Sequence, residues 1–254
     1  MYDMARAEKA TAEKDDPAQA IDLWTRQPPG SRKPRYTLDQ IAEAAMRIAD
    51  AEGIDALSMR RLAAELGAGT MTLYHYVRGK DELLALVTDR VMAELIVPDD
   101  EFPEGWREAM TTIARRSRDA MLRHPWVFDI AEEPAAGPNG ARHFDQSLQA
   151  VASLPLSLTD RVDILSTVDA YVFGYCLEAR NDSRFDFPEV SRAMVDYTIE
   201  LTKTGDYPQL SALIAEHGPE GLWRELYTYS QDESRFDRAL SRLLDGIARD
   251  LQVT

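Results

Sequence analysis

Residues 57–84 read LSMRRLAAELGAGTMTLYHYVRGKDELL, and this stretch decides the fold. Ser58 is a natural N-cap for a short helix with inward-facing apolar residues that ends at Leu66. Gly67 follows, where a helix commonly ends in a left-handed residue that glycine adopts at little cost. A second short helix is predicted over residues 70–76. This is helix-turn-helix spacing, in which the second helix enters the major groove of DNA.

The rest of the chain is also helical in pattern. Thr37 and Gln40 have the form of a capping box, so a helix is expected to begin at Thr37. Residues 81–95 predict a further helix that ends before Pro98. Later helical patterns, separated by proline and glycine, cover residues 103–123, 125–133, 138–153, 159–180, 186–204, 207–216 and 233–251. No alternating strand pattern is found, so the fold class is predicted to be all-α.

The charge of the chain is unevenly distributed. The formal net charge is −15, which by itself argues against DNA binding. Residues 31–80, however, contain eight basic and six acidic residues, a local charge of +2 that leaves −17 for the remainder. A locally basic surface is what phosphate groups require, and an acidic remainder opposes non-specific association with DNA or simply keeps the protein soluble.

Composition limits the cellular setting. The chain has 254 residues, 44% of them hydrophobic, and a single cysteine, Cys176, which excludes an internal disulfide. The N-terminus has no apolar stretch typical of a secretory signal, and no run of 18 apolar residues predicts a membrane span. We therefore expect a cytoplasmic protein.

The motif around the helix-turn-helix resembles the DNA-binding domain of the TetR family of bacterial repressors. The residues that carry the resemblance are Leu57-x-x-Arg60-x-Leu62-Ala63-x-x-Leu66-Gly67-x-x-x-x-Thr72-Leu73-Tyr74-x-Tyr76-x-x-x-Lys80-x-x-Leu83-Leu84, preceded by Ile41, Ala45, Ile48, Ala49 and Gly53. A more divergent second stretch, from Trp106 through His124-Pro125-Trp126 to Gly137-Pro138-Asn139, resembles the ligand-binding half of the tetracycline-repressor-like branch.

The resemblance implies a division into functional segments. We expect a flexible N-terminal extension over residues 1–30, a helix-turn-helix DNA-binding domain over 31–80, a connecting helix over 81–97, and a helical ligand-binding and dimerisation domain over 98–254. The basic segment from Ser31 to Arg35 is either an arm for the minor groove or a solvated linker.

Seven residues are predicted to contact DNA. Arginine can form paired hydrogen bonds with guanine or clamp a phosphate, threonine and tyrosine hydroxyls suit bases or phosphates, and lysine suits a phosphate. The predicted contacts are Arg35, Arg60, Thr70, Thr72, Tyr74, Tyr76 and Lys80. Leu73 and Val77 are interpreted as core residues. The small side chains of the second helix suggest that DNA shape and methyl contacts contribute to recognition.

The predicted ligand-binding and dimerisation domain, residues 98–254, is called the body below, and it has two predicted roles. Aromatic and polar residues interleave there as in small-molecule sites, although each one taken alone is more typical of core. The predicted pocket comprises Trp106, Met110, His124, Trp126, Phe128, Phe144, Asp169, Phe173 and Tyr175. Two late helices carry apolar stripes, and the resemblance places them between two subunits of a homodimer. The predicted interface comprises Val162, Leu165, Leu240, Leu243, Leu244 and Ile247.

Enzymatic and metal-dependent roles are not expected. The four histidines and one cysteine have no metal-ligand spacing, and no nucleophile-elbow motif occurs. In the tetracycline repressor a histidine binds the drug's magnesium, and counting without gaps from His124 the matching position is Ala131. No metal or cofactor is therefore predicted.

The sequence thus predicts a transcriptional regulator, most simply a repressor that binds double-stranded operator DNA and is released by a small-molecule effector. Two alternatives remain open at this point. A protein partner could control the regulator in place of a small molecule, and the regulator could act as an activator.

Overall fold

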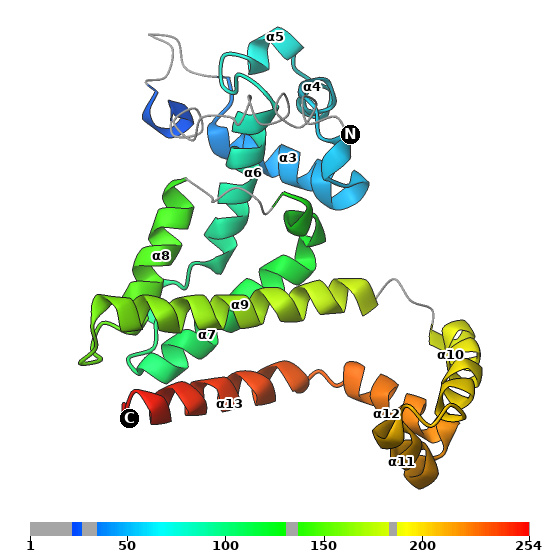
Figure 1. The fold of residues 1–254 in the computed structure, drawn as a ribbon. Coiled ribbons are helices and arrows are strands. Elements are labelled where there is room, and N and C mark those ends of the chain that lie inside the picture. The colour runs from blue at the N-terminus through cyan, green and yellow to red at the C-terminus, as the bar shows by residue number, and fades with distance from the viewer. Residues whose placement is uncertain (1–21, 27–34, 131–136, 183–186, 254) are drawn as a thin grey trace, which may run out of the picture. The chain divides into compact units, whose positions relative to one another are not determined.

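The computed structural model describes residues 22–26, 35–130, 137–182 and 187–253, and the side chains of these residues except for 181–191. In these ranges the chain consists of helices and turns without a strand (Figure 1), which confirms the all-α prediction. None of the described helices combines the length and the apolar character that a membrane crossing requires. Residues 1–21 and 27–34, which include most of the predicted extension and the arm up to Pro34, lie outside the described residues, as does Ala131.

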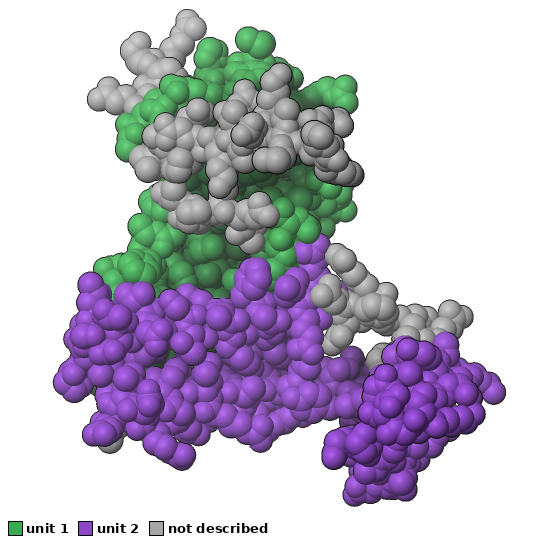
Figure 2. Space-filling view, in the orientation of Figure 1, with its two compact units in different colours: residues 1–153 green, residues 154–254 purple. Residues whose placement is uncertain are grey.

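The chain divides into two compact units, residues 1–153 and 154–254 (Figure 2), and each is described by itself. The helices of the first unit are α3 (Leu38–Glu52), η1 (Ile54–Ala56), α4 (Met59–Leu66), α5 (Thr70–Leu73), α6 (Lys80–Leu95), η2 (Asp99–Glu101), α7 (Trp106–Arg123), η3 (Pro125–Asp129) and α8 (Pro138–Ala150). Those of the second unit are α9 (Leu158–Asp182), α10 (Phe187–Thr202), α11 (Pro208–His217), α12 (Pro219–Ser230) and α13 (Arg235–Asp250).

Local signals place the first helices where the sequence predicts them. The Thr37 hydroxyl accepts a hydrogen bond from the Gln40 backbone N–H (3.1 Å), and the Gln40 side chain accepts one from the Thr37 N–H (3.0 Å), which completes the capping box before α3. Ser58 caps α4 by accepting from the Arg61 N–H (3.2 Å). Each cap satisfies backbone donors that the first turn of a helix leaves unpaired.

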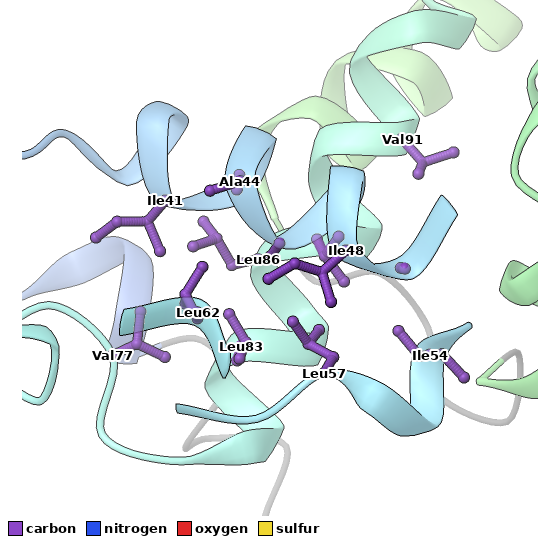
Figure 3. Packing of buried hydrophobic residues seen from close by; sticks show 14 of the residues in the cluster. Ile41, Ala44, Ile48, Ile54, Leu57, Leu62, Val77, Leu83, Leu86 and Val91 are labelled. Carbon is purple, nitrogen blue, oxygen red and sulfur yellow. The ribbon is translucent and has the colours of Figure 1, made fainter. Parts of the chain in front are cut away.

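A continuous apolar core joins α3, α4, α5 and α6. Its members are fully or almost fully buried, and the close-up in Figure 3 shows several of them pointing toward one another: Ile41, Ile48, Leu57, Leu62, Val77, Leu83 and Leu86. Leu73 and Val77 have no exposed surface, which confirms their interpretation as core residues. The core holds α5 on a fixed support, because each of these side chains would lose about 1.5–3 kcal/mol of burial energy on exposure.

A short N-terminal turn packs on this core. Residues 22–25 are helical, and Leu23 is buried within the apolar cluster. Arg26 pairs with Glu82 at the start of α6 (2.7 Å), and Arg78 pairs with Asp22 (2.5 Å). Residues 22–26 are thus attached to the helix-turn-helix region by both apolar and ionic contacts.

The second unit contains two sets of packed helices. α9 lies against α13, where the Tyr171 hydroxyl donates to the Phe236 carbonyl (2.8 Å). α10, α11 and α12 pack on one another. Sequence pattern predicts a helix over residues 207–216 and none from there to residue 233, so α12 is an additional helix. Gly218, at φ 71°, ends α11, and Pro219 begins α12 at the helical position that tolerates proline best.

Candidate nucleic-acid interface

The turn between α4 and α5 is built by glycine at a left-handed position. Gly67 has φ 59° and ψ 36°, a conformation that costs other residues roughly 1–2 kcal/mol. The Ala68 N–H donates to the Ala63 carbonyl (2.9 Å) and the Gly67 N–H to the Ala64 carbonyl (3.3 Å), the pair of bonds that defines a Schellman ending. α5 begins three residues later at Thr70, which confirms the predicted helix-turn-helix.

Two tyrosines brace this turn against the segment before α3. The Tyr76 hydroxyl accepts hydrogen bonds from the backbone N–H groups of Arg35 (3.0 Å) and Tyr36 (3.3 Å). The Tyr36 hydroxyl donates to the Leu66 carbonyl at the end of α4 (3.0 Å), and the two rings meet edge to face with centroids 6.3 Å apart. We call the helices α3, α4 and α5 the reading head. Tyr76, which the sequence predicts as a DNA contact, therefore holds the segment that leads into it.

The basic residues of this region fall into two electrostatic classes. Arg47 pairs with Glu65 (3.7 Å), Arg61 with both Glu52 (2.6 Å) and Glu65 (3.0 Å), and Arg78 with Asp22. Mutual hydrogen bonding raises the pKa of Arg61 and lowers that of Glu52.

The remaining three cations, Arg35, Arg60 and Lys80, are exposed and have no carboxylate partner among the described residues. These are the three basic residues predicted to contact DNA, and their charges are available to phosphates.

Two exposed residues in and just after α5 are not among the predicted DNA contacts. Met71 on α5 is 75% exposed, the highest value among the large apolar side chains described, and His75, in the turn that follows the helix, is also exposed. Tyr74 is 42% exposed, whereas Thr70 and Thr72 are half-buried. The periodicity contained the signal, since a helix that points Leu73 inward must point Met71, two residues earlier, outward. An apolar side chain there suits the methyl group of thymine.

Two predicted pocket residues instead connect the body to the reading head. His124 and Trp126 are 2% and 4% exposed, and Asp50 at the end of α3 accepts from the Trp126 indole N–H (2.7 Å) and lies 2.6 Å from His124 Nδ1. The other imidazole nitrogen lies 3.3 Å from a carboxylate oxygen of Glu94 on α6, which also pairs with Arg123. His124 also ends α7, so it joins three helices.

The other predicted pocket residues are distributed over both units. In the first unit Trp106 and Met110 are buried, Phe128 is half-buried and Phe144 is 52% exposed. A separate open hollow of about 370 Å³ in this unit has a charged lining formed by Glu94, Arg116, Asp119 and Arg123.

In the second unit, Tyr175 packs edge to face on Phe236, with ring centroids 5.0 Å apart, and Phe173 is 39% exposed. Solvent reaches Asp169, yet surrounding atoms desolvate its carboxylate and raise its pKa to about 6.

The predicted interface residues differ in accessibility. Val162 is 36% exposed, and Leu243 and Ile247 are half-buried, so these three have surface to offer a second copy. Leu165, Leu240 and Leu244 are 4%, 1% and 1% exposed in the single chain. Leu165, Leu240 and Leu244 are therefore covered within the single chain, and their place between two subunits stays a prediction.

Comparisons with known proteins agree with this architecture. Residues 41–87 match the family model described as bacterial regulatory proteins, tetR family, and residues 98–251 match the tetracyclin repressor-like C-terminal domain. The HTH-type transcriptional repressor DrrR1 of Streptomyces coeruleorubidus is 36% identical over 247 residues, which cover 93% of this chain and 87% of that protein. The tetracycline repressor protein class E of Escherichia coli is 24% identical over 153 residues, 60% of this chain and 72% of that protein.

Solved structures show the same fold. Apo ActR from Streptomyces coelicolor superposes with a TM-score of 0.67 at 31% identity, covering 87% of this chain and 99% of that one. ActR in complex with actinorhodin superposes with a TM-score of 0.69 at 30% identity, covering 86% and 98%.

Proposed function

This chain belongs to the tetR family of bacterial regulatory proteins, and from that membership we propose that it is a transcriptional repressor that leaves its operator when a small molecule binds to its body. The observation that carries the proposal is the exposed face of α4 and α5, where Arg60 and Met71 project from a rigid apolar core. Lys80 adds a positive charge at the start of α6 that no described carboxylate neutralises.

The operator is expected to have two-fold symmetry. A homodimer presents two copies of α5, and a two-fold axis would place them about 34–36 Å apart, one turn of DNA. The accessible apolar residues Val162, Leu243 and Ile247 support such a pairing of the second unit. The site of action is the bacterial cytoplasm.

The effector is expected to be a small organic molecule of the kind that ActR binds, of which actinorhodin and (S)-DNPA are examples. Within the second unit, the candidate contacts are Phe173, Tyr175 and Asp169, and burial raises the pKa of the Asp169 carboxyl to about 6. To shift the population from almost fully bound to almost fully released, the effector must favour the released state by about 5.5 kcal/mol in total.

The proposal is tested by fluorescence anisotropy with a duplex taken from immediately upstream of the protein's own gene, with random duplex as competitor. We expect binding that resists the competitor, two protomers per site, and an affinity that falls steeply with salt. Addition of actinorhodin tests release in the same cuvette. Binding equal to that of random duplex would contradict a repressor acting at this site.

Arg60→Ala and Arg47→Ala form a matched pair within this assay. Both remove one positive charge, but Arg60 has no described carboxylate partner, whereas Arg47 lies on α3 with Glu65 as its partner. Loss of a direct base or phosphate contact costs about 1–3 kcal/mol, so Arg60→Ala is expected to weaken operator binding about 5- to 150-fold. Arg47→Ala should change it little. Equal losses in the two variants would show that only net charge matters.

A further inference from the structure

Helix α6 is shared by two sets of contacts within the first unit. α6 belongs to the core of the reading head along its length, through Leu83, Leu86, Val87, Val91 and Leu95, and Arg90 on α6 pairs with Glu43 on α3 (3.6 Å). The same helix packs against α8, to which Asp89 is hydrogen-bonded. Any force that α8 exerts on α6 is therefore transmitted through a continuous helix to the support of α5.

The attachment of α8 to α6 begins at a buried carboxylate. Asp89 is 1% exposed, and its Oδ1 accepts hydrogen bonds from the backbone N–H groups of Asn139 and Gly140 (3.0 Å each). Its Oδ2 accepts from the side-chain amide of Asn139 (2.8 Å). Burial raises the pKa of Asp89, while the three donors act in the opposite direction.

These bonds satisfy the N–H groups of Asn139 and Gly140 in the first turn of α8. Its N-cap, Gly137, has no side chain to donate or accept, and Pro138 at the first position has no N–H group. The next two N–H groups are those that Asp89 accepts, and the Ala141 N–H begins the regular helical pattern. A negative charge at this place also interacts favourably with the helix dipole. α8 thus obtains its N-terminal cap from another helix.

A second attachment lies one to two turns further along α8. The buried side chain of Gln146 accepts from the Val97 N–H (3.0 Å) and donates to the Val97 carbonyl (2.7 Å), just beyond the end of α6. Asp89 and Val97 are eight residues apart in the α6 segment, and Asn139 and Gln146 are seven apart in α8. Two separated attachments of similar spacing prevent the helices from both sliding and rotating.

We propose that Asp89 is a positioning residue that joins α8 and α6 into one rigid body, so that the position of α8 and the occupancy of α5 by DNA are thermodynamically coupled. This inference rests on the proposed function, because it names the route by which the body and the DNA site communicate. Coupling between two sites is reciprocal, so DNA bound at α5 must alter α8 to the same extent that α8 alters DNA binding. The route can consequently be tested from the DNA side.

Hydrogen exchange measured by mass spectrometry on the full chain provides the test. In the free protein, Asp89→Ala is expected to speed exchange in peptides from both α8 and α6, at least fivefold, while the same change at Asp145, an exposed residue of α8, leaves both unchanged. Faster exchange in α8 alone would overturn the rigid-body inference. This measurement does not involve DNA, so it stands whether or not the proposed function is correct.

The second stage adds the upstream duplex. Typical coupling energies correspond to factors of about 5–150, so DNA binding should slow exchange of the Asn139 and Gly140 amides about fivefold or more in the wild type. Asp89→Ala should abolish that effect. DNA binding that leaves α8 unchanged, or an equal change in both proteins, would overturn the inference, whereas failure to bind any specific DNA would instead contradict the proposed function.

Two milder variants keep the test valid if Asp89→Ala does not fold. Asp89→Asn retains one oxygen for the two backbone N–H groups, and Asn139 can turn its amide to match, so the coupling should survive. Asn139→Ala removes one of the three bonds and should reduce the coupling partially. Loss of coupling in Asp89→Asn with normal helical content would contradict the geometry proposed for this cap.

Discussion

Gly137→Ala should strongly destabilise the first unit, and the reason lies entirely in the neighbour of Gly137. A Cβ atom on this residue would lie 2.1 Å from Oδ1 and 2.2 Å from Cγ of Asp89, which is far too close for atoms that are not bonded to each other. The backbone itself is not special, since φ is −86° and ψ is 171°. The carboxylate must therefore move away, and in moving it abandons the N-terminus of α8.

The expected loss follows from the bonds that Asp89 makes. Hydrogen bonds to a charged group contribute about 1.5–3 kcal/mol each, so loss of the two backbone bonds alone costs about 3 kcal/mol or more. Gly105 provides the matched control. It is the N-cap of α7, has a similar backbone conformation, and has no atom within 4 Å of the place that a Cβ would occupy. The ordinary cost of alanine at an N-cap is common to both variants.

Urea and thermal unfolding, followed by circular dichroism, measure the difference. We expect the free energy of unfolding of Gly137→Ala to be about 3 kcal/mol lower than that of Gly105→Ala. For a unit of this size, this corresponds to a thermal unfolding midpoint that is lower by roughly 6–12 °C. In an Asp89→Ala background the penalty of Gly137→Ala should disappear, because the clashing group is absent. Equal stability of the two glycine variants would refute the account of α8 given above.

Three further predictions concern other parts of the chain. Trp126→Phe should lower the free energy of unfolding by about 1.5–3 kcal/mol in urea titrations, because Asp50 loses a buried donor; an unchanged midpoint would show that the bond contributes nothing. Leu240→Glu should reduce the helical circular dichroism signal because the site is buried, whereas Val162→Glu should preserve it and shift the sedimentation coefficient toward a monomer; the opposite pattern would mean that the interface is misplaced. The folded-state pKa of Asp169, about 6, exceeds its ordinary 3.8, so its contribution to stability is complete below about pH 4 and lost as pH rises through 6. Asp169→Asn should therefore be the more stable protein at about pH 7 and equal to wild type at about pH 4, and parallel pH profiles would contradict the desolvation of this carboxylate.

Local sequence signals predicted the reading head well. The caps at Thr37 and Ser58 and the left-handed Gly67 depend on residues within a few positions of one another, so their patterns are visible in the sequence itself. The choice of Arg60 and Lys80 agrees with their lack of ionic partners in the described structure. Met71 is not among the predicted contacts, all of which have charged or hydroxyl-bearing side chains.

Long-range contacts account for most of what the sequence could not predict. Asp50 contacts His124 and Trp126, which are 74 and 76 positions later in the chain. Asp89 contacts Asn139 and Gly140, which are 50 and 51 positions later, and no local pattern indicates either pairing. Periodicity likewise identified the apolar stripe that contains Leu240 but not the surface that covers it. A buried stripe looks the same in sequence whether its partner is the same chain or another copy.

The sharing of α6 has a consequence for the engineering of hybrid regulators. A chimera that takes its reading head from one relative and its body from another would normally be joined at the boundary between two matched domains. Here a junction before Asp89 would separate Arg90 from Glu43 and Val91 from the core around α3, whereas a junction after Leu95 would separate Asp89 from Asn139 and Gly140, so either choice breaks a set of contacts described above. New operator specificity is better introduced by replacing exposed residues, such as Met71 on α5 and Tyr74 at its C-cap, on an otherwise intact chain.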